Sequence, residues 1–70
     1  MVTMRAPAEE AAIAVVRKYD IRGGAFSAEV IQDSHASRLM SVRVNRQEIA
    51  RVRIKNFIGL GWQEETYERI

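Results

Sequence analysis

The stretch SVRVNRQEIARVRI, from Ser41 to Ile54, decides the fold of this chain. Its apolar residues alternate with polar ones before Asn45 and again from Ala50 onward, which is the period of a half-buried β-strand. β-Branched residues fill most of the inward positions, as strands prefer. A slip of one residue would bring arginines into the core, so the pattern also constrains the register. The stretch predicts a β-hairpin that turns a row of arginines toward one face.

The same stretch has a helical interpretation. The segment NRQEIAR resembles the start of the first helix in many helix-turn-helix proteins, and Asn45 and Glu48 have the spacing of a capping box. With Ala50 at the usual alanine of that motif, its turn glycine should fall at position 54, which holds Ile54. Apolar residues would also spread around most of the helical wheel, where an amphipathic helix needs one stripe. The hairpin is therefore the preferred prediction.

The pairing that keeps the two faces of the hairpin matched gives a specific register. It sets Val44 opposite Ala50, Val42 opposite Val52 and Met40 opposite Ile54, with the turn at Asn45 to Ile49 or at the central three of these residues. Arg43 then lies directly opposite Arg51, and facing like charges destabilise a sheet. We therefore expect compensation, either from glutamates of this chain or from an external anionic partner. The internal candidates are Glu29, Glu64, Glu65 and Glu68.

The segments on either side of the hairpin predict the remaining elements. Residues 1–6 form a loose lead-in, and Pro7 begins an alanine-rich helix over residues 7–19. Strands are predicted within residues 25–56, beginning with the alternating run from Ala25 to Gln32, and Gln32 to Ser37 have turn chemistry. Residues 57–70 form an apolar loop and a tail, which is either a short strand or a helical turn. The prediction is an α+β domain in the order α-β-β-β, one N-terminal helix packed on a small antiparallel sheet of three strands, or of four with the tail.

Length and composition limit the class of protein. Seventy residues make a single domain, residues 1–70, with a small core and marginal stability. The chain has no cysteine and one histidine, which excludes disulfides and a cysteine-based zinc site. Small cores without such links often gain stability by association, so a homodimer is expected. No membrane partner and no targeting signal are expected, and the cytoplasm is the predicted location.

Basic residues concentrate in the middle third of the chain. Between residues 38 and 55, six basic side chains accompany a single glutamate, although the net charge of the whole chain is +2. A basic sheet face suits nucleic-acid phosphates, and the planar guanidinium of arginine fits phosphate well. It also suits an acidic protein surface, and a surface charge network within the chain is the simplest interpretation. The candidate residues for binding nucleic acid or an acidic partner are Arg38, Arg43, Arg46, Arg51, Arg53 and Lys55.

An apolar segment broken by glycines, FIGLGW, follows the basic hairpin. Its large residues either cap one end of a small core, which needs every apolar side chain, or form an interface with aromatic anchors. A second copy of the chain would fit such an interface as well as a foreign protein would. The candidate interface residues are Phe57, Leu60, Trp62 and Tyr67.

The element order α-β-β-β and the length are similar to those of double-stranded-RNA-binding domains. That family carries a histidine in the loop between its first two strands, where His35 lies here, and a VxV pattern in its second strand, which Met40 to Val44 partly match. The resemblance implies nucleic-acid binding. The basic, lysine-led start of the family's last helix is missing, because KNFIGLGWQEE follows Ile54. Base stacking on the sheet is not expected either, since Phe26 is predicted to face the core.

The sequence shows no catalytic arrangement. Asp33, Ser34 and His35 are the residue types of a catalytic triad, but three consecutive residues cannot place the histidine between the other two. We therefore expect no enzymatic activity, no cofactor, no metal and no small-molecule substrate. Two functions are predicted instead. One is nucleic-acid binding through the basic hairpin face, and the other is protein interaction, since in size and character the chain resembles small phage or mobile-element inhibitors and adaptors, anti-CRISPR inhibitors among them, which bind host protein complexes.

Overall fold

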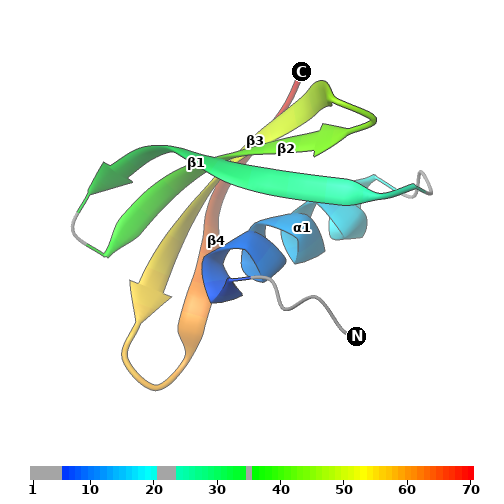
Figure 1. Ribbon diagram of the computed structural model, residues 1–70. Coiled ribbons are helices and arrows are strands. Elements are labelled where there is room, and N and C mark those ends of the chain that lie inside the picture. Colours follow the sequence, from blue (N-terminus) through cyan, green and yellow to red (C-terminus); the bar gives the residue numbers. More distant parts are fainter. Residues whose placement is uncertain (1–5, 21–23, 35) are drawn as a thin grey trace.

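The computed structural model describes residues 6–20, 24–34 and 36–70, which form one helix and a four-stranded antiparallel sheet (Figure 1). The helix α1 spans Pro7–Tyr19, and the strands are β1 (Phe26–Ser34), β2 (Ser37–Val44), β3 (Gln47–Phe57) and β4 (Gly61–Arg69). The strands lie in the sheet in chain order. The predicted α+β fold is confirmed, and the tail is its fourth strand. Most of the predicted lead-in, and His35, lie outside the described residues.

The bounds of α1 follow from its local sequence. Pro7 lies in the first turn, where its missing N–H is not needed, and Ala6 before it has extended backbone. Glutamates in the first turn and basic residues in the last turn interact favourably with the two ends of the helix dipole and stabilise the helix. The buried face consists of small and β-branched side chains, which let the helix lie close to the sheet. These are Ala8, Ala12, Ile13, Val15 and Val16.

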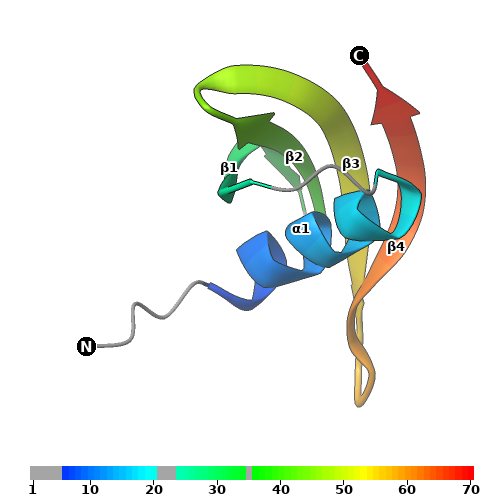
Figure 2. The same cartoon turned by 90° about the vertical axis from the view of Figure 1, so that its right-hand side faces the viewer.

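The core lies between α1 and one face of the sheet, which curves around the helix (Figure 2). α1 contacts all four strands, and the central strands supply most of the buried sheet residues. This is a two-layer arrangement, in which the helix buries its apolar stripe against one sheet face. The other face, called here the outer face, has no element of the described chain packed on it. The buried apolar residues of the sheet are Phe26, Ala28, Met40, Val42, Val44, Ile49, Ala50, Val52 and Ile54.

The β2–β3 hairpin forms as predicted, but the predicted register is wrong. Its observed partners are Val42 with Ala50, Met40 with Val52 and Arg38 with Ile54. The turn contains two residues, Asn45 and Arg46, whose φ angles of 53° and 69° are those of the tight turns that join hairpin strands best. If the register set by this turn continued along both strands, inward residues of β2 would lie opposite outward residues of β3. A β-bulge at Ile49 adds one residue to β3 and restores the match between faces.

The other two hairpins also differ in detail from the prediction. β1 continues to Ser34, so the turn before β2 is shorter than the predicted segment from Gln32 to Ser37. The predicted apolar loop is a tight turn between β3 and β4, in which the Leu60 N–H donates a 3.1 Å hydrogen bond to the Phe57 carbonyl. Gly59 has a φ of 83°, which explains a glycine at this position. The segment after this turn is the strand β4, whereas the resemblance to double-stranded-RNA-binding domains implies a helix there.

Candidate binding surface at the β3–β4 hairpin

The structure separates the six predicted basic residues into three places. Arg38 pairs with the inward-facing Ile54, so it lies on the helix side of the sheet. Arg46 lies in the β2–β3 turn, at the opposite end of β3 from the β3–β4 turn. The remaining four lie on the outer face, where they alternate with the buried residues of β2 and β3. These four are Arg43, Arg51, Arg53 and Lys55.

Two arginines of the outer face are neutralised within the chain. The predicted opposition of Arg43 and Arg51 does not occur, because the two-residue turn sets Arg43 opposite Glu48 and the bulge then sets Arg51 opposite Ser41. Arg51 donates hydrogen bonds of 3.1 and 3.4 Å to the two carboxylate oxygens of Glu48. Arg43 Nη2 lies 3.5 Å from Glu29 Oε1, as the sequence suggested. This half of the face is a charge network of the chain itself.

Glu48 is the centre of that network. The buried hydroxyl of Ser41 donates a 2.5 Å hydrogen bond to Glu48 Oε2. This bond, followed by those from Arg51, holds the pKa of Glu48 below its usual value of 4.5. The carboxylate is therefore ionised at neutral pH and compensates the positive charge around it.

The other two cations of the outer face have no such compensation. Arg53 donates a 3.4 Å hydrogen bond to the neutral side chain of Gln32. Lys55 Nζ lies 5.6 Å from the ring centroid of Phe57. Within the described part of the chain, neither forms an ion pair with a carboxylate. Their neighbours across the strands are uncharged: Ser37 and Leu39 on β2, and Gln63 and Thr66 on β4.

Large apolar residues lie exposed next to these cations. Ile58 is fully exposed, with a relative accessibility of 104%, and Leu60 reaches 72%. Phe57 is 43% exposed and lies on the outer face, two residues beyond Lys55. The apolar tip therefore does not cap the core. We call this cationic and apolar region the hairpin-end surface, formed by Arg53, Lys55, Phe57, Ile58 and Leu60.

Trp62 and Tyr67, predicted as interface residues, lie on the helix side of the sheet. Both are partly buried and pack against the core. The Arg38 guanidinium lies 4.8 Å from the ring centroid of Trp62, and Arg38 Nε lies 3.4 Å from Asp33 Oδ1. Tyr67 stacks on Tyr19 of the helix, with ring centroids 4.3 Å apart and an interplanar angle of 18°. These two aromatic residues hold β4 against the rest of the fold.

Glu64, a candidate to neutralise the arginine row, instead bonds to the helix. Lys18 Nζ and the Tyr19 hydroxyl donate hydrogen bonds of 2.5 and 2.6 Å to its two carboxylate oxygens. Both bonds lower the pKa of Glu64, the one from Lys18 more. The same bonds raise the pKa values of Lys18 and Tyr19. This cluster fixes the C-terminal end of α1 to β4.

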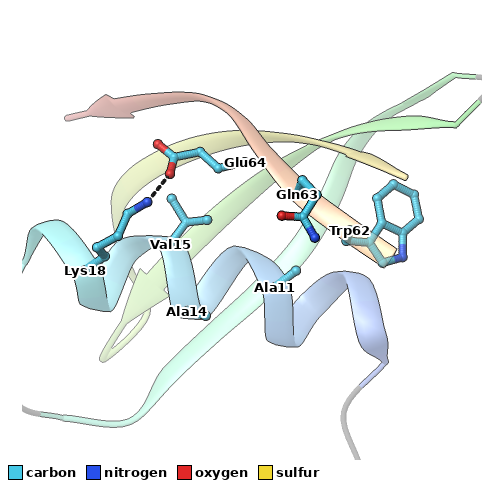
Figure 3. A pocket seen from close by; sticks show the side chains of 7 residues that line it. All are labelled: Ala11, Ala14, Val15, Lys18, Trp62, Gln63 and Glu64. Carbon is cyan, nitrogen blue, oxygen red and sulfur yellow. Dashed lines mark hydrogen bonds and ion pairs between the residues drawn. The ribbon is translucent and has the colours of Figure 1, made fainter. Parts of the chain in front are cut away.

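A shallow groove lies between α1 and β4, beside this cluster (Figure 3). Its volume is about 260 Å³. Ala11, Ala14 and Val15 line it from the helix, and Trp62 and Glu64 line it from β4. No group of three or more histidine, cysteine, aspartate or glutamate side chains suited to a metal occurs among the described residues. In that part of the chain, no helix has the length and apolar character of a membrane span.

Ile58 is the residue of the hairpin-end surface that the sequence pattern did not identify as a candidate interface residue. Its signal is the flanking pattern, because a residue directly before a glycine in a tight turn has no strand partner to cover it. Comparison with protein-family models, curated proteins and solved structures found no match to this chain.

Proposed function

We propose that this protein is a non-enzymatic protein-interaction module that binds an acidic protein surface through its hairpin-end surface. The observation that carries the proposal is the fully exposed Ile58, with Leu60 beside it and the uncompensated Arg53 and Lys55 behind it. In a domain of this size, a large apolar residue left in water is lost to the core. Its transfer out of water becomes favourable for binding when a partner covers it.

The apolar tip supplies the affinity in this proposal. Full burial of one isoleucine, leucine or phenylalanine side chain is worth roughly 1.5–3 kcal/mol. Three such residues, Phe57, Ile58 and Leu60, form a small anchor of the kind that dominates binding energy at interfaces. Their turn is held by the Leu60 to Phe57 backbone hydrogen bond, so little ordering is needed on binding.

Arg53 and Lys55 supply direction and selectivity. Charges at the rim of an interface steer association and exclude partners of like charge more than they add affinity. Two cations with uncharged neighbours favour a partner with acidic residues around an apolar pocket. This proposal covers a foreign partner, such as a host complex bound by a small inhibitor, and places the protein in the cytoplasm.

Nucleic-acid binding is the second candidate, and one observation favours it. Arg53, Lys55 and the exposed ring of Phe57 lie in a row on the outer face of β3. Single-stranded nucleic acid is bound by such combinations of cations and stacking aromatic rings. With two uncompensated cations, the logarithm of affinity should fall with the logarithm of salt concentration with a slope of about −1.4. A footprint of all six basic residues would give a slope near −4.

The test compares two double variants with the wild-type protein. Ile58→Ser with Leu60→Ser removes the apolar tip, and Arg53→Gln with Lys55→Gln removes the cations while the strand is kept. Partners captured from a host lysate are identified by mass spectrometry, and the affinity of the purified partner is then measured for all three proteins. Fluorescence anisotropy of labelled single-stranded and duplex DNA and RNA, over roughly 50–300 mM salt, tests the second candidate.

The two candidates predict opposite rankings. For a protein partner, the apolar double variant loses at least about a hundredfold in affinity, and the cationic one loses about tenfold or less. For nucleic acid, the cationic variant loses binding and the apolar one retains it. A purified partner that binds the apolar double variant as tightly as wild type would refute the proposed function. A second copy as the partner would appear as a dimer in sedimentation equilibrium that the apolar variant abolishes.

A further inference from the structure

The apolar tip of the β3–β4 hairpin and the groove between α1 and β4 are neighbours on the same chain. The turn that carries Ile58 and Leu60 projects beyond α1 (Figures 1 and 2). Trp62 stands at the end of the groove that is closest to this turn (Figure 3). The tip does not reach its own groove, because β4 begins at Gly61, directly after Leu60. An exposed apolar projection therefore lies beside an open hollow that it cannot fill itself.

The groove suits apolar side chains better than charged ones. Ala11 and Ala14 line it with methyl groups, and the Trp62 ring lines it from β4 (Figure 3). Its two charged lining groups neutralise each other, since Lys18 Nζ donates a 2.5 Å hydrogen bond to Glu64 Oε1. An entering apolar side chain leaves this ion pair intact, whereas an entering charge finds no unpaired counter-ion in the lining. The lining therefore selects an uncharged, apolar group.

The two side chains of the tip match the groove in length and in volume. The helix rises about 10 Å from Ala11 to Lys18. Ile58 and Leu60 are two residues apart in the chain, so at most about 7 Å separates their Cα atoms. Two four-carbon side chains occupy roughly 240 Å³, at about 30 Å³ for each group of the size of a water molecule. The volume of the groove is about 260 Å³. These dimensions allow the tip of another copy to fill it.

We propose that two copies of this chain form a reciprocal dimer, in which Ile58 and Leu60 of each copy lie in the α1–β4 groove of the other. Because the tip and the groove are neighbours, a single two-fold axis brings each tip to the groove of the other copy. Closed two-fold contacts of this kind are by far the commonest form of homo-oligomer. Each Trp62 ring then packs on the apolar tip of the second copy.

The charges of the hairpin-end surface do not oppose this dimer. Arg53 and Lys55 lie on the outer face of the sheet, on the other side from the groove, and stay in water when the tip is covered. Gln63, the uncharged polar residue of the lining, donates a 2.9 Å hydrogen bond to the carbonyl of Leu60 in its own turn. The dimer therefore covers the apolar part of the hairpin-end surface and leaves its cations uncompensated.

This difference gives the dimer a regulatory role, an inference that rests on the proposed function. The dimer buries two apolar tip residues per copy, whereas a standard interface has roughly 20–30 residues on each side. We expect a weak dimer, with a dissociation constant on the order of 100 µM. An acidic partner covers the same tip and also compensates Arg53 and Lys55, so it displaces the second copy. Self-association thus covers the tip until such a partner binds.

Sedimentation equilibrium of the whole protein, from about 10 µM to about 1 mM, measures the dimer in the absence of a partner. Wild type should change from monomer to dimer over this range and form nothing larger. Ile58→Ser with Leu60→Ser, called here the tip variant, removes the apolar tip and keeps the groove. It should weaken the dimer at least about tenfold.

A matched pair of variants tests the groove. Ala14→Arg fills the groove with a long side chain at an exposed helix position, where arginine is a good helix former, and it keeps the tip. Ala25→Arg adds the same side chain at an exposed position outside the groove. We expect Ala14→Arg to weaken the dimer at least about tenfold and Ala25→Arg to leave it within about twofold. Circular dichroism of both variants checks that the fold is kept.

Mixing the two defective proteins tests the contact directly. The ¹⁵N-labelled tip variant has an intact groove, and unlabelled Ala14→Arg has an intact tip, so one of the two contacts of the dimer forms again. We expect the indole N–H of Trp62 and the amides of Ala11 and Ala14 in the labelled protein to shift as Ala14→Arg is added. The control is an unlabelled protein that combines Ala14→Arg with the tip variant, and it should cause no shift.

Four results would overturn the dimer. The first is a wild type that is monomeric at about 1 mM. The second is an Ala14→Arg variant that dimerises like wild type, which would indicate contact between two tips. The third is a mixture without shifts at the groove. The fourth is growth of wild type beyond a dimer, which would indicate a head-to-tail chain of copies.

The regulatory role is tested separately, so that the dimer and the proposed function fail by different results. A purified acidic partner should convert the wild-type dimer into a complex with one copy of this chain. Ala14→Arg should bind that partner within about twofold of wild type at concentrations below about 10 µM, where wild type is monomeric. A partner that binds the dimer without dissociating it would overturn the regulatory role. A partner that binds the tip variant as tightly as wild type would refute the proposed function and leave the dimer standing.

Discussion

Arg43 lies opposite Glu48 across the β2–β3 hairpin, because the turn between the strands has two residues, and the extra residue Ile49 then sets Arg51 opposite Ser41. The short turn and this bulge together replace the predicted opposition of two arginines with an alternation of charges. Glu48 also accepts hydrogen bonds from Arg51 and from the buried Ser41. Glu48, together with Glu29 beside Arg43, thus neutralises one half of the outer face, and the half with Arg53 and Lys55 stays cationic.

Ser41→Ala and Glu48→Gln are predicted to act differently on stability. Ser41→Ala removes one hydrogen bond, and the free energy of unfolding should fall by about 1 kcal/mol. Glu48→Gln keeps an oxygen acceptor for Ser41 but removes the charge that compensates Arg43 and Arg51. Because folding lowers the pKa of Glu48, its contribution is present above pH 4.5 and is lost as the pH falls through the lower, folded-state value.

Urea denaturation at pH 7 and at pH 3 checks this prediction. Wild type should lose stability between the two pH values, and Glu48→Gln should lose less of it. Glu29→Gln, at the edge of the same network, is the control and should have a smaller effect. An identical pH dependence in wild type and Glu48→Gln would show that Glu48 does not stabilise the fold through its charge.

The sequence predicts the elements of this fold because their periods are simple. The helix bounds, the hairpin in place of a helix-turn-helix, and the inward faces of β2 and β3 all follow from alternation and from Pro7. The register does not follow, because it depends on one unpaired residue, Ile49, that alternation alone does not reveal. The sequence does not distinguish strand from helix in the tail for the same reason, since the bulge at Glu65 breaks the period of β4.

The candidate site is less predictable than the fold because it depends on the register. Composition shows six basic residues. Whether a glutamate lies opposite each of them depends on the register of the neighbouring strands. Trp62 and Tyr67 look like partners of Phe57 in the sequence, yet the bulge at Glu65 brings both to the helix side. Charge and aromatic content therefore indicate a binding surface, and strand geometry decides its members.

Stability should have an acid and an alkaline limit set by Lys18, Tyr19 and Glu64. Folding lowers the pKa of Glu64, so its contribution is complete above 4.5 and is lost as the pH falls through its folded-state value. Folding raises the pKa values of Lys18 and Tyr19, so their contributions are present below about 10 and are lost as the pH rises through the raised values. The cluster therefore stabilises the fold between roughly pH 5 and pH 9.

Glu64→Gln tests this cluster. Thermal unfolding from pH 3 to pH 11 should show a broad maximum in wild type, and the variant should have a lower and flatter profile. Glu65→Gln, one residue away, is the matched control, and its profile should follow that of wild type. If the two variants have the same profile, the Lys18–Glu64–Tyr19 cluster does not contribute as proposed.

The same substitution at two isoleucines should separate core from surface. Ile13 is fully buried and Ile58 is fully exposed. Ile13→Ala should lower the free energy of unfolding by about 2–4 kcal/mol, because it leaves a cavity between α1 and the sheet. A domain of this length has only about 3.5–10 kcal/mol in total, so the variant should be largely unfolded near 45 °C or below.

Ile58→Ala should change stability by less than about 0.5 kcal/mol, and should raise solubility by removing exposed apolar surface. Chemical denaturation of both variants measures the difference. A cost above 1 kcal/mol for Ile58→Ala would mean that the tip packs on the fold, and the hairpin-end surface would then not be free for a partner.

Arg46→Gly should stabilise the protein. Arg46 has a φ of 69°, and Asn45 before it has a φ of 53°. An arginine in this left-handed conformation costs about 1–2 kcal/mol. Glycine avoids this cost, but part of the gain is offset because glycine loses more conformational entropy on folding. The sequence Asn-Gly is also the preferred pair for this turn. The net gain in the free energy of unfolding should be about 0.5–1 kcal/mol, measured by urea denaturation.

Asn45→Val is the opposing control, because a β-branched residue is poorly tolerated at positive φ, and it should destabilise the hairpin. Arg46→Gly also separates this residue from the binding surface, since it lies at the other end of β3 from Lys55. The variant should bind any partner of the hairpin-end surface with wild-type affinity. A loss of affinity of more than about tenfold would instead mean that the binding surface extends along the whole length of β3. Arg43 and Arg51 would then have to leave their glutamates and pair with anions of the partner.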